Sequence, residues 1–158
     1  MKIKHSRGIR AACAALMMVS LSGCVSFDGG AVPFVGLRSI DGVLVFRDCN
    51  PISANEIKIR QGEEGDAPKD MKWVWIAATP QNGGTTVVSS VTYGVPPEGM
   101  VVSVGPDPIS PESVIQFSVL RREGTTVTDA RQATFHLSQL SDDEWLMASG
   151  KLASAPCT

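Results

Sequence analysis

From residue 34 onward, the sequence is a succession of short β-type runs that turn-forming residues separate. The runs are rich in Val and Thr and recur about every ten residues, and no apolar pattern of helical period continues for the length of a helix. We expect strands over residues 34–40, 43–47, 56–60, 71–78, 85–95, 100–104, 113–120, 125–137 and 145–149. This spacing predicts an all-β fold, a single antiparallel β-sandwich, with another kind of β-barrel as the alternative.

The clearest turn lies between the first two runs. Asp41-Gly42 separates residues 34–40 from residues 43–47, and an Asp-Gly pair between two β-type runs is the strongest short signal for a hairpin. We therefore expect these two runs to pair directly.

The largest side chains are candidates either for the core or for a binding surface. Trp73 and Trp75 alternate within one run, which places them on one face of a regular strand and Val74 and Ile76 on the other. Alternating tryptophans can form a flat platform for a sugar ring or a partner, and they are also what a sandwich core requires. Because both faces of this run are apolar, we interpret it as a covered strand and assign Trp73, Trp75 and Tyr93 to the core.

The first 23 residues differ in character from the rest. Four Lys and Arg residues lie among the first ten, residues 11–21 form an almost uninterrupted apolar run, and no acidic residue precedes Asp28. The apolar run is too short for a stable transmembrane helix, which needs about 20 residues. A basic start, a short apolar middle and small residues at the end predict an export signal.

The end of this segment resembles the lipobox of bacterial lipoproteins, a Leu and two small residues before a Cys. Here the motif reads Leu21-Ser22-Gly23-Cys24. The resemblance implies that Cys24 carries a diacylglycerol, that the chain is cleaved before it, and that the new N-terminus is usually acylated as well. Two or three acyl chains hold a protein stably at a membrane.

This resemblance divides the chain into a signal peptide (residues 1–23), a lipidated tether (24–32) and the β-sandwich domain (33–158). The expected location is the cell membrane or the outer membrane, outside the cytoplasm. Residue 25 is Val rather than Asp, which in the family's sorting pattern favours the outer membrane where two membranes exist. The eight tether residues after Cys24 span at most about 29 Å, so we expect the domain to work close to the membrane.

The cysteines that remain after this assignment form one pair. Cys13 lies in the signal and Cys24 is the lipidation site, so Cys49 and Cys157 are left. An even number of Cys in an oxidising compartment predicts a disulfide. A two-Cys metal site is the weaker alternative, because His136 is the only mature histidine and no CxxC occurs.

A second resemblance concerns the C-terminal part of the chain. Leu137 and Leu140, followed by Trp145, are similar to the Leu-x-x-Leu corner before the next-to-last strand of fibronectin type III and other immunoglobulin-like domains. The family usually has Tyr after the corner, and here Trp145 takes that position. Its indole can only donate a hydrogen bond, so the hydrogen bond of the corner is not expected in the same form. The resemblance implies an immunoglobulin-like sandwich.

The sequence offers little chemistry for catalysis. His136 alternates with Phe135 and Leu137, which predicts a solvent-facing strand histidine, and no GxSxG, HExxH or phosphate-binding motif occurs. Neither Asp142-Asp143-Glu144 nor Glu63-Glu64-Gly65-Asp66 with Asp70 has the spacing of a calcium loop. We predict no catalytic residue, no cofactor and no metal.

The net charge of the domain indicates which classes of partner it can bind. Without the signal, the net charge changes from −2 to −6, because four basic and no acidic residues are removed. An acidic domain without a basic stripe is not expected to bind nucleic acid. We expect a non-enzymatic binding or structural module anchored to the membrane through its lipid, with an envelope protein or a glycan as partner. The alternatives are a hydrolase or metal-dependent enzyme that uses His136 and nearby carboxylates, or an accessory protein or inhibitor of another envelope protein.

Overall fold

The computed structural model describes residues 35–81 and 84–157. The predicted signal peptide, the lipidation site Cys24 and the tether over residues 24–32 lie outside the described residues, so these assignments remain predictions. Within the described part, no helix is long and apolar enough to cross a membrane.

The described residues form ten strands and one short 3₁₀ turn, η1 (Leu137–Gln139). The strands are β1 (Val35–Ile40), β2 (Val43–Ala54), β3 (Glu56–Gly62), β4 (Lys72–Ala78), β5 (Thr86–Thr92), β6 (Val101–Val104), β7 (Val114–Glu123), β8 (Thr126–His136), β9 (Trp145–Met147) and β10 (Leu152–Ala153). Nine of them correspond to the strands expected from the sequence, and only the two-residue β10 was not expected.

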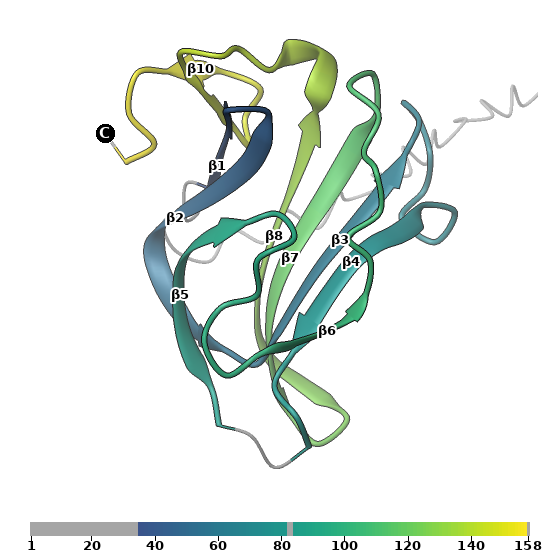
Figure 1. Ribbon diagram of the computed structural model, residues 1–158, viewed down its shortest axis with the longest axis vertical. Coiled ribbons are helices and arrows are strands. Elements are labelled where there is room, and N and C mark those ends of the chain that lie inside the picture. Colours follow the sequence, from purple (N-terminus) through teal and green to yellow (C-terminus); the bar gives the residue numbers. More distant parts are fainter. Residues whose placement is uncertain (1–34, 82–83, 158) are drawn as a thin grey trace, which may run out of the picture. The chain divides into compact units, whose positions relative to one another are not determined.

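The strands pair into two antiparallel sheets that pack face to face (Figure 1). One sheet has the order β10-β9-β1-β2-β5, which we call sheet A, and the other has the order β6-β4-β3-β7-β8, which we call sheet B. The predicted all-β, antiparallel sandwich is therefore confirmed. The facing sets β1-β2-β5 and β4-β3-β7-β8 are consistent with an immunoglobulin-like fold, to which β9, β10 and β6 are added at the edges.

The β1–β2 hairpin forms where the Asp-Gly pair predicts it. Asp41 and Gly42 have φ angles of 51° and 77°, and Ile40 pairs with Val43 across the turn. Two successive positive φ angles are the mark of the tight hairpin turn whose twist matches that of the strands.

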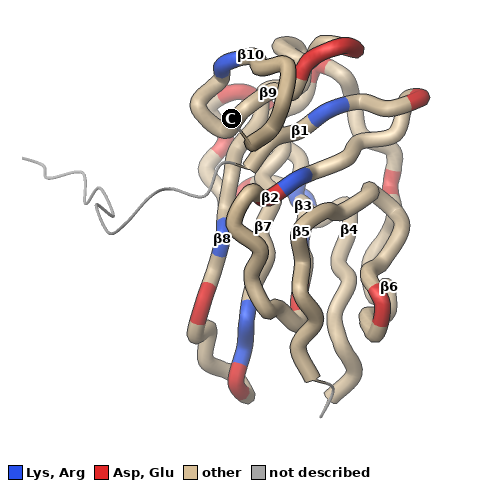
Figure 2. Tube along the Cα trace, turned by 90° about the vertical axis from the view of Figure 1, so that its left-hand side faces the viewer, with Lys and Arg blue, Asp and Glu red and all other residues tan. Residues whose placement is uncertain are grey.

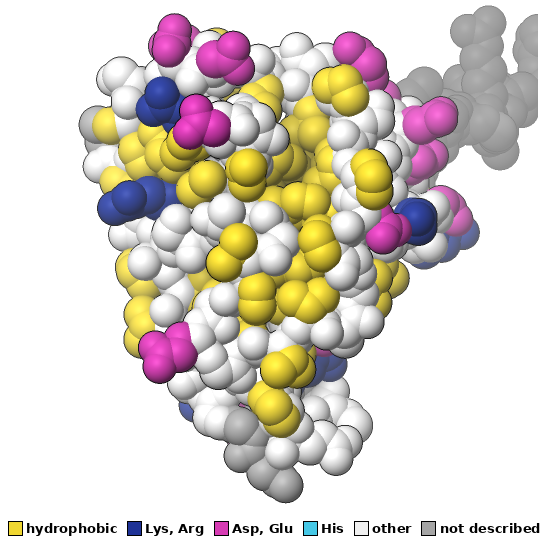
Figure 3. All heavy atoms as spheres, viewed as in Figure 1, with side chains coloured by type: hydrophobic (Ala, Val, Ile, Leu, Met, Phe, Trp, Pro, Cys, Tyr) yellow, Lys and Arg dark blue, Asp and Glu magenta, His cyan; other side chains and the backbone are white. Residues whose placement is uncertain are grey.

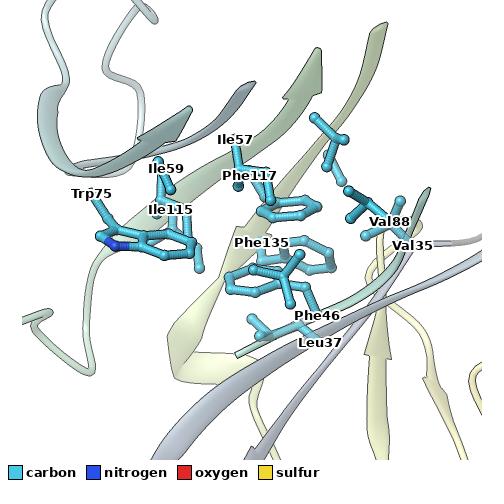
Figure 4. Close-up of a cluster of buried hydrophobic side chains, with 14 of the residues drawn as sticks. Val35, Leu37, Phe46, Ile57, Ile59, Trp75, Val88, Ile115, Phe117 and Phe135 are labelled. Atoms are coloured by element: carbon cyan, nitrogen blue, oxygen red, sulfur yellow. The ribbon is translucent and has the colours of Figure 1, made fainter. Parts of the chain in front are cut away.

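Three phenylalanines join the two sheets at the middle of the sandwich. Phe46 of β2 stacks on Phe117 of β7 with ring centroids 4.3 Å apart, and Phe135 of β8 meets Phe46 edge-on at 6.1 Å. All three are buried, and Figure 4 shows them between the sheets with Leu37 and Ile57. Such aromatic pairs add about 0.5–1.5 kcal/mol to the stabilisation that burial provides.

A β-bulge separates the two tryptophans of β4, which corrects one sequence-based expectation. Trp75 pairs with Ile59, whereas Trp73 pairs with the next residue, Arg60, so Val74 is an extra residue on β4. Val74 and Trp75 are both buried as a result, and Trp73 points outward with 37% of its surface exposed. The core assignment is right for Trp75 and wrong for Trp73, because a bulge interrupts the two-residue alternation.

The exposed Trp73 lies against two cations of the neighbouring strand. The Lys58 ammonium is 5.4 Å and the Arg60 guanidinium 5.0 Å from the centre of its ring. These are cation–π distances. A single indole flanked by two cations is therefore present on the outer face of sheet B, and the alternative of a two-tryptophan platform is not formed.

The predicted pair of cysteines is bonded. Cys49 lies in β2 where its pairing with β5 is interrupted between Arg47 and Ile52. Its Cα atom is 5.3 Å from that of Cys157. The disulfide fastens the C-terminal segment to β2 of sheet A, and the two cysteines are 108 residues apart in the sequence.

The segment that resembles an immunoglobulin-type corner takes the chain from sheet B to sheet A. Leu137 is buried in η1, where its N–H donates to the carbonyl of Ser113 at 3.0 Å. Trp145 is buried at the start of β9. The resemblance implied that the corner precedes the next-to-last strand of an immunoglobulin-like sandwich. However, β9 lies outside β1 near the edge of sheet A, so the turn leads into an added strand rather than into the facing sets of strands.

Candidate binding cleft

At one end of the sandwich the two sheets separate, and an apolar cleft opens between three segments of the chain. The segments are the β1–β2 hairpin, the loop of residues 105–111 and the η1 turn with the residue after it. The cavity has a volume of about 540 Å³, which is within the range of pockets that bind ligands. Figure 3 shows hydrophobic side chains gathered on this face, around a hollow beside the β1–β2 hairpin. Its apolar lining consists of Val43, Leu44, Tyr93, Pro106, Pro108, Ile109, Pro111, Leu137 and Leu140.

The loop that forms one wall of the cleft is fixed to sheet B. The N–H of Asp107 donates to the carbonyl of Val74 at 3.0 Å, and its carboxylate pairs with Lys72 Nζ at 2.7 Å. At the other end of the loop, the Ser113 hydroxyl donates to the carbonyl of Ser110 at 2.6 Å. The prolines between these points have a fixed φ and no N–H, so the wall is stiff and presents mainly carbon to the cleft.

Glycine is required where this loop meets β4. Gly105 has a φ of 68°, and a Cβ atom placed on it would lie 2.0 Å from the carbonyl oxygen of Val74. Any other residue would force the loop away from the bulge of β4. The bulge and the loop therefore depend on each other, because the Val74 carbonyl accepts the Asp107 N–H at the same point.

Tyr93 forms part of the floor of the cleft, and its hydroxyl is already used. The O–H donates to the carbonyl of Asp107, and the carbonyl of Val74 lies 3.2 Å away. The ring packs edge-on against Trp75, with centroids 5.8 Å apart. Burial and the nearby charge of Asp107 raise the pKa of Tyr93 to about 12, so the phenol is neutral at physiological pH.

A polar hollow adjoins the apolar cleft. It has a volume of about 390 Å³ and shares Ser39 and Gly42 with the cleft. Its walls include Arg38, Asp41 and Asp142, and both aspartates are exposed. The acidic turn of the β1–β2 hairpin and the acidic segment before β9 lie at the same end of the sandwich (Figure 2).

Two carboxyl groups elsewhere in the sandwich have shifted pKa values. Burial opposes the ionisation of Glu56, but hydrogen bonds from Lys58 and Arg122 outweigh it and lower the pKa of its carboxyl. The Lys58 ammonium is 2.8 Å from this carboxylate. Asp48 is buried beside the disulfide, and desolvation raises the pKa of its carboxyl. Neither carboxylate lines the cleft.

The structure places His136 away from the cleft. The residue is half-exposed at the end of β8 and lines a separate hollow of about 350 Å³ with Gln139, Met147 and other residues that include no Asp, Glu or Cys. The residues described contain no group of three or more His, Cys, Asp or Glu side chains that is placed to hold a metal ion. Asp142 and Asp143, the carboxylates closest to His136 in the C-terminal part of the sequence, do not line this hollow.

Sequence reasoning did not identify the cleft. The clearest signal was the run Pro106-Asp107-Pro108-Ile109-Ser110-Pro111, in which three prolines surround an isoleucine in a loop. No protein-family model, curated protein or solved structure matches this chain.

Proposed function

We propose that this chain is a lipid-anchored protein of the cell envelope, and that its immunoglobulin-like sandwich is a non-enzymatic binding module whose binding site is the apolar cleft. The cleft is the observation that carries this proposal. It exposes leucine, isoleucine, valine and proline side chains at the mouth of a cavity, and apolar pockets with few polar groups are the usual form of a ligand site.

The polar groups around the cleft favour binding over catalysis. The Tyr93 hydroxyl donates to a backbone carbonyl, and the Asp107 carboxylate is paired with Lys72. General acid–base catalysis needs a side chain that is free to exchange a proton with the substrate. The remaining lining offers mainly apolar surface, which contributes about 25 cal/mol per Å² when a ligand covers it.

The lipid anchor follows from the motif of residues 21–24 and is tested separately. Expressed in a bacterial host, the chain should partition into detergent and carry the mass of its acyl chains. Cys24→Ser should be neither lipidated nor cleaved at this site. A fully soluble wild type without added mass would exclude the anchor.

The binding role is tested by the accessibility of the cleft in cells. With Cys24 lipidated and the Cys49–Cys157 disulfide closed, Val43→Cys introduces a single reactive thiol at the cleft. Val127→Cys is the matched control, because both valines lie at the start of a strand and are similarly exposed, at 40% and 43%. If the cleft is occupied in its own envelope, alkylation of Val43→Cys is slower in cells than in the purified chain, whereas Val127→Cys reacts equally in both. Equal rates for Val43→Cys would contradict the proposal.

A further inference from the structure

We infer that the cleft binds an extended peptide segment of a partner protein in which an apolar side chain lies two positions from Lys or Arg. This inference rests on the proposed function and adds the chemistry of the ligand. It follows from the two adjoining hollows, which differ in polarity and share Ser39 and Gly42.

The carboxylates at the polar hollow outnumber the one cation in its walls. Among the described residues, neither Asp41 nor Asp142 forms an ion pair. The one basic residue in the walls, Arg38, donates from Nε to the backbone carbonyl of Asp142 at 3.2 Å. Glu112, which follows the cleft residue Pro111 on the opposite wall, is also exposed and forms no ion pair in the described part. The rim is therefore acidic and complements a cation.

The apolar cleft next to this acidic rim favours an apolar side chain of the ligand. Val43 and Leu44 follow Gly42 directly in the hairpin, so the apolar and acidic walls meet within a few residues. In an extended peptide, side chains two positions apart point to the same side and lie about 6.6 Å apart along the chain. One segment can therefore place an apolar side chain in the cleft and a Lys or Arg two positions away beside Asp41 and Asp142. An anionic lipid head group would face like charges at the same place, which disfavours a phospholipid as ligand.

The experiment screens a random peptide display library against the full chain, purified from membranes in non-ionic detergent and immobilised. Val43→Lys puts a cation and bulk into the cleft, and Val127→Lys makes the same change at the matched position on β8. The double variant Asp41→Asn/Asp142→Asn removes the two carboxylates but keeps the size of the side chains. All four proteins are compared in the same micelles, so binding to detergent cancels.

We expect the enriched peptides to contain an apolar residue within two positions of Lys or Arg. Their binding should be lost in Val43→Lys and kept in Val127→Lys. The double Asn variant should bind them several-fold more weakly, as should the wild type when salt is raised to about 1 M, where the Debye length falls to about 3 Å.

Two results would overturn the inference. Peptides that depend on Val43 but lack basic residues and bind the double Asn variant equally would remove the cationic requirement and leave the binding module in place. A library that yields no peptide sensitive to Val43→Lys would exclude a peptide ligand, while the alkylation experiment would still decide whether the cleft is occupied.

Discussion

The middle of the sandwich and its cleft end are built by the same two sheets, yet they use apolar side chains in opposite ways. In the middle, Phe46 stacks on Phe117 at 4.3 Å, and both are buried. At the cleft end, Leu44, Tyr93 and Leu140 are only partly buried and pack against the core from one side. Side chains in the middle bury their surface against each other, whereas those at the cleft end leave part of their surface exposed.

The difference arises from what closes each region. Strands from both sheets cross the middle, so the side chains of one sheet fill the gaps of the other. At the cleft end the walls are a hairpin tip, a proline-containing loop and a 3₁₀ turn, and the loop is held by hydrogen bonds and an ion pair rather than by apolar side chains that fill the space. We therefore expect the middle to determine stability and the cleft end to determine binding.

The largest expected effect is on the middle. Phe117→Ala should lower the free energy of unfolding by about 3–5 kcal/mol, because it leaves a cavity between the sheets and removes the stack with Phe46. Val43→Ala at the cleft should cost less than about 1 kcal/mol. Urea denaturation of both variants measures the contrast. Similar losses for the two variants would show that the cleft end is as tightly packed as the middle.

The disulfide should have the next largest effect. Removing it in the double variant Cys49→Ser/Cys157→Ser should cost about 2–5 kcal/mol, because the bond closes a long loop and holds the C-terminal segment on β2. The wild type should show no free thiol when it is denatured without reductant, apart from any Cys that lacks its lipid. The cleft lies at other residues, so peptide binding well below the melting temperature should be unchanged. Loss of binding in the folded double variant would mean that the C-terminal segment shapes the cleft.

The sequence predicts those features of the fold that depend on neighbouring residues or on the number of cysteines. Asp41-Gly42 specifies its hairpin because the two residues tolerate positive φ, and Cys49 and Cys157 were paired by counting. The strand positions followed from alternation and turn residues. The two-residue β10 was missed because Leu152-Ala153 is too short to show alternation.

The features that were not predicted depend on contacts between distant segments. The bulge at Val74 is set by how β4 pairs with β3 and by the loop that Gly105 brings against it, and neither is visible in residues 71–78. The cleft combines the hairpin, the proline-containing loop and the turn after β8, which are far apart in the sequence. Its lining residues are ordinary apolar residues in each segment taken alone, so only the fold reveals them as a site.

A smaller effect is expected at Tyr93, where the middle meets the cleft. Tyr93→Phe should cost about 0.5–1.5 kcal/mol, the net value of a hydrogen bond, since the carbonyl of Asp107 loses its donor. Tyr93 is the only tyrosine of the chain, so ultraviolet absorbance can follow its ionisation directly. The midpoint should lie near pH 12, in agreement with its raised pKa, and should fall toward about 10 when the chain is unfolded.

The raised pKa also predicts how stability changes with pH. Between about pH 10 and 12 the unfolded chain has released the Tyr93 proton and the folded chain still holds it, so the folded state binds more protons and stability falls as pH rises. Tyr93→Phe should lack this contribution, so its stability should fall less steeply over the same range. A midpoint near 10 in the folded wild type would show that the hydroxyl is exposed to water and free to contact a ligand.

The smallest expected effect is at His136, which lies outside both regions. Its ring is half-exposed at the end of the edge strand β8, whereas its neighbours Phe135 and Leu137 point into the core. Acid–base catalysis near neutral pH relies on a positioned histidine more than on any other side chain, so an enzyme of this fold would be expected to use this residue. No carboxylate lines the hollow that it occupies, so the ring lacks the acidic partner that orients the histidine of a catalytic triad.

His136→Ala should therefore change the free energy of unfolding by less than about 0.5 kcal/mol and leave peptide binding at the cleft unchanged. Thermal melts of both forms, together with an activity screen over esters, peptides, glycosides and phosphates, measure these effects. A turnover that is present in the wild type and absent in His136→Ala would place the function of the domain in this hollow instead of the cleft.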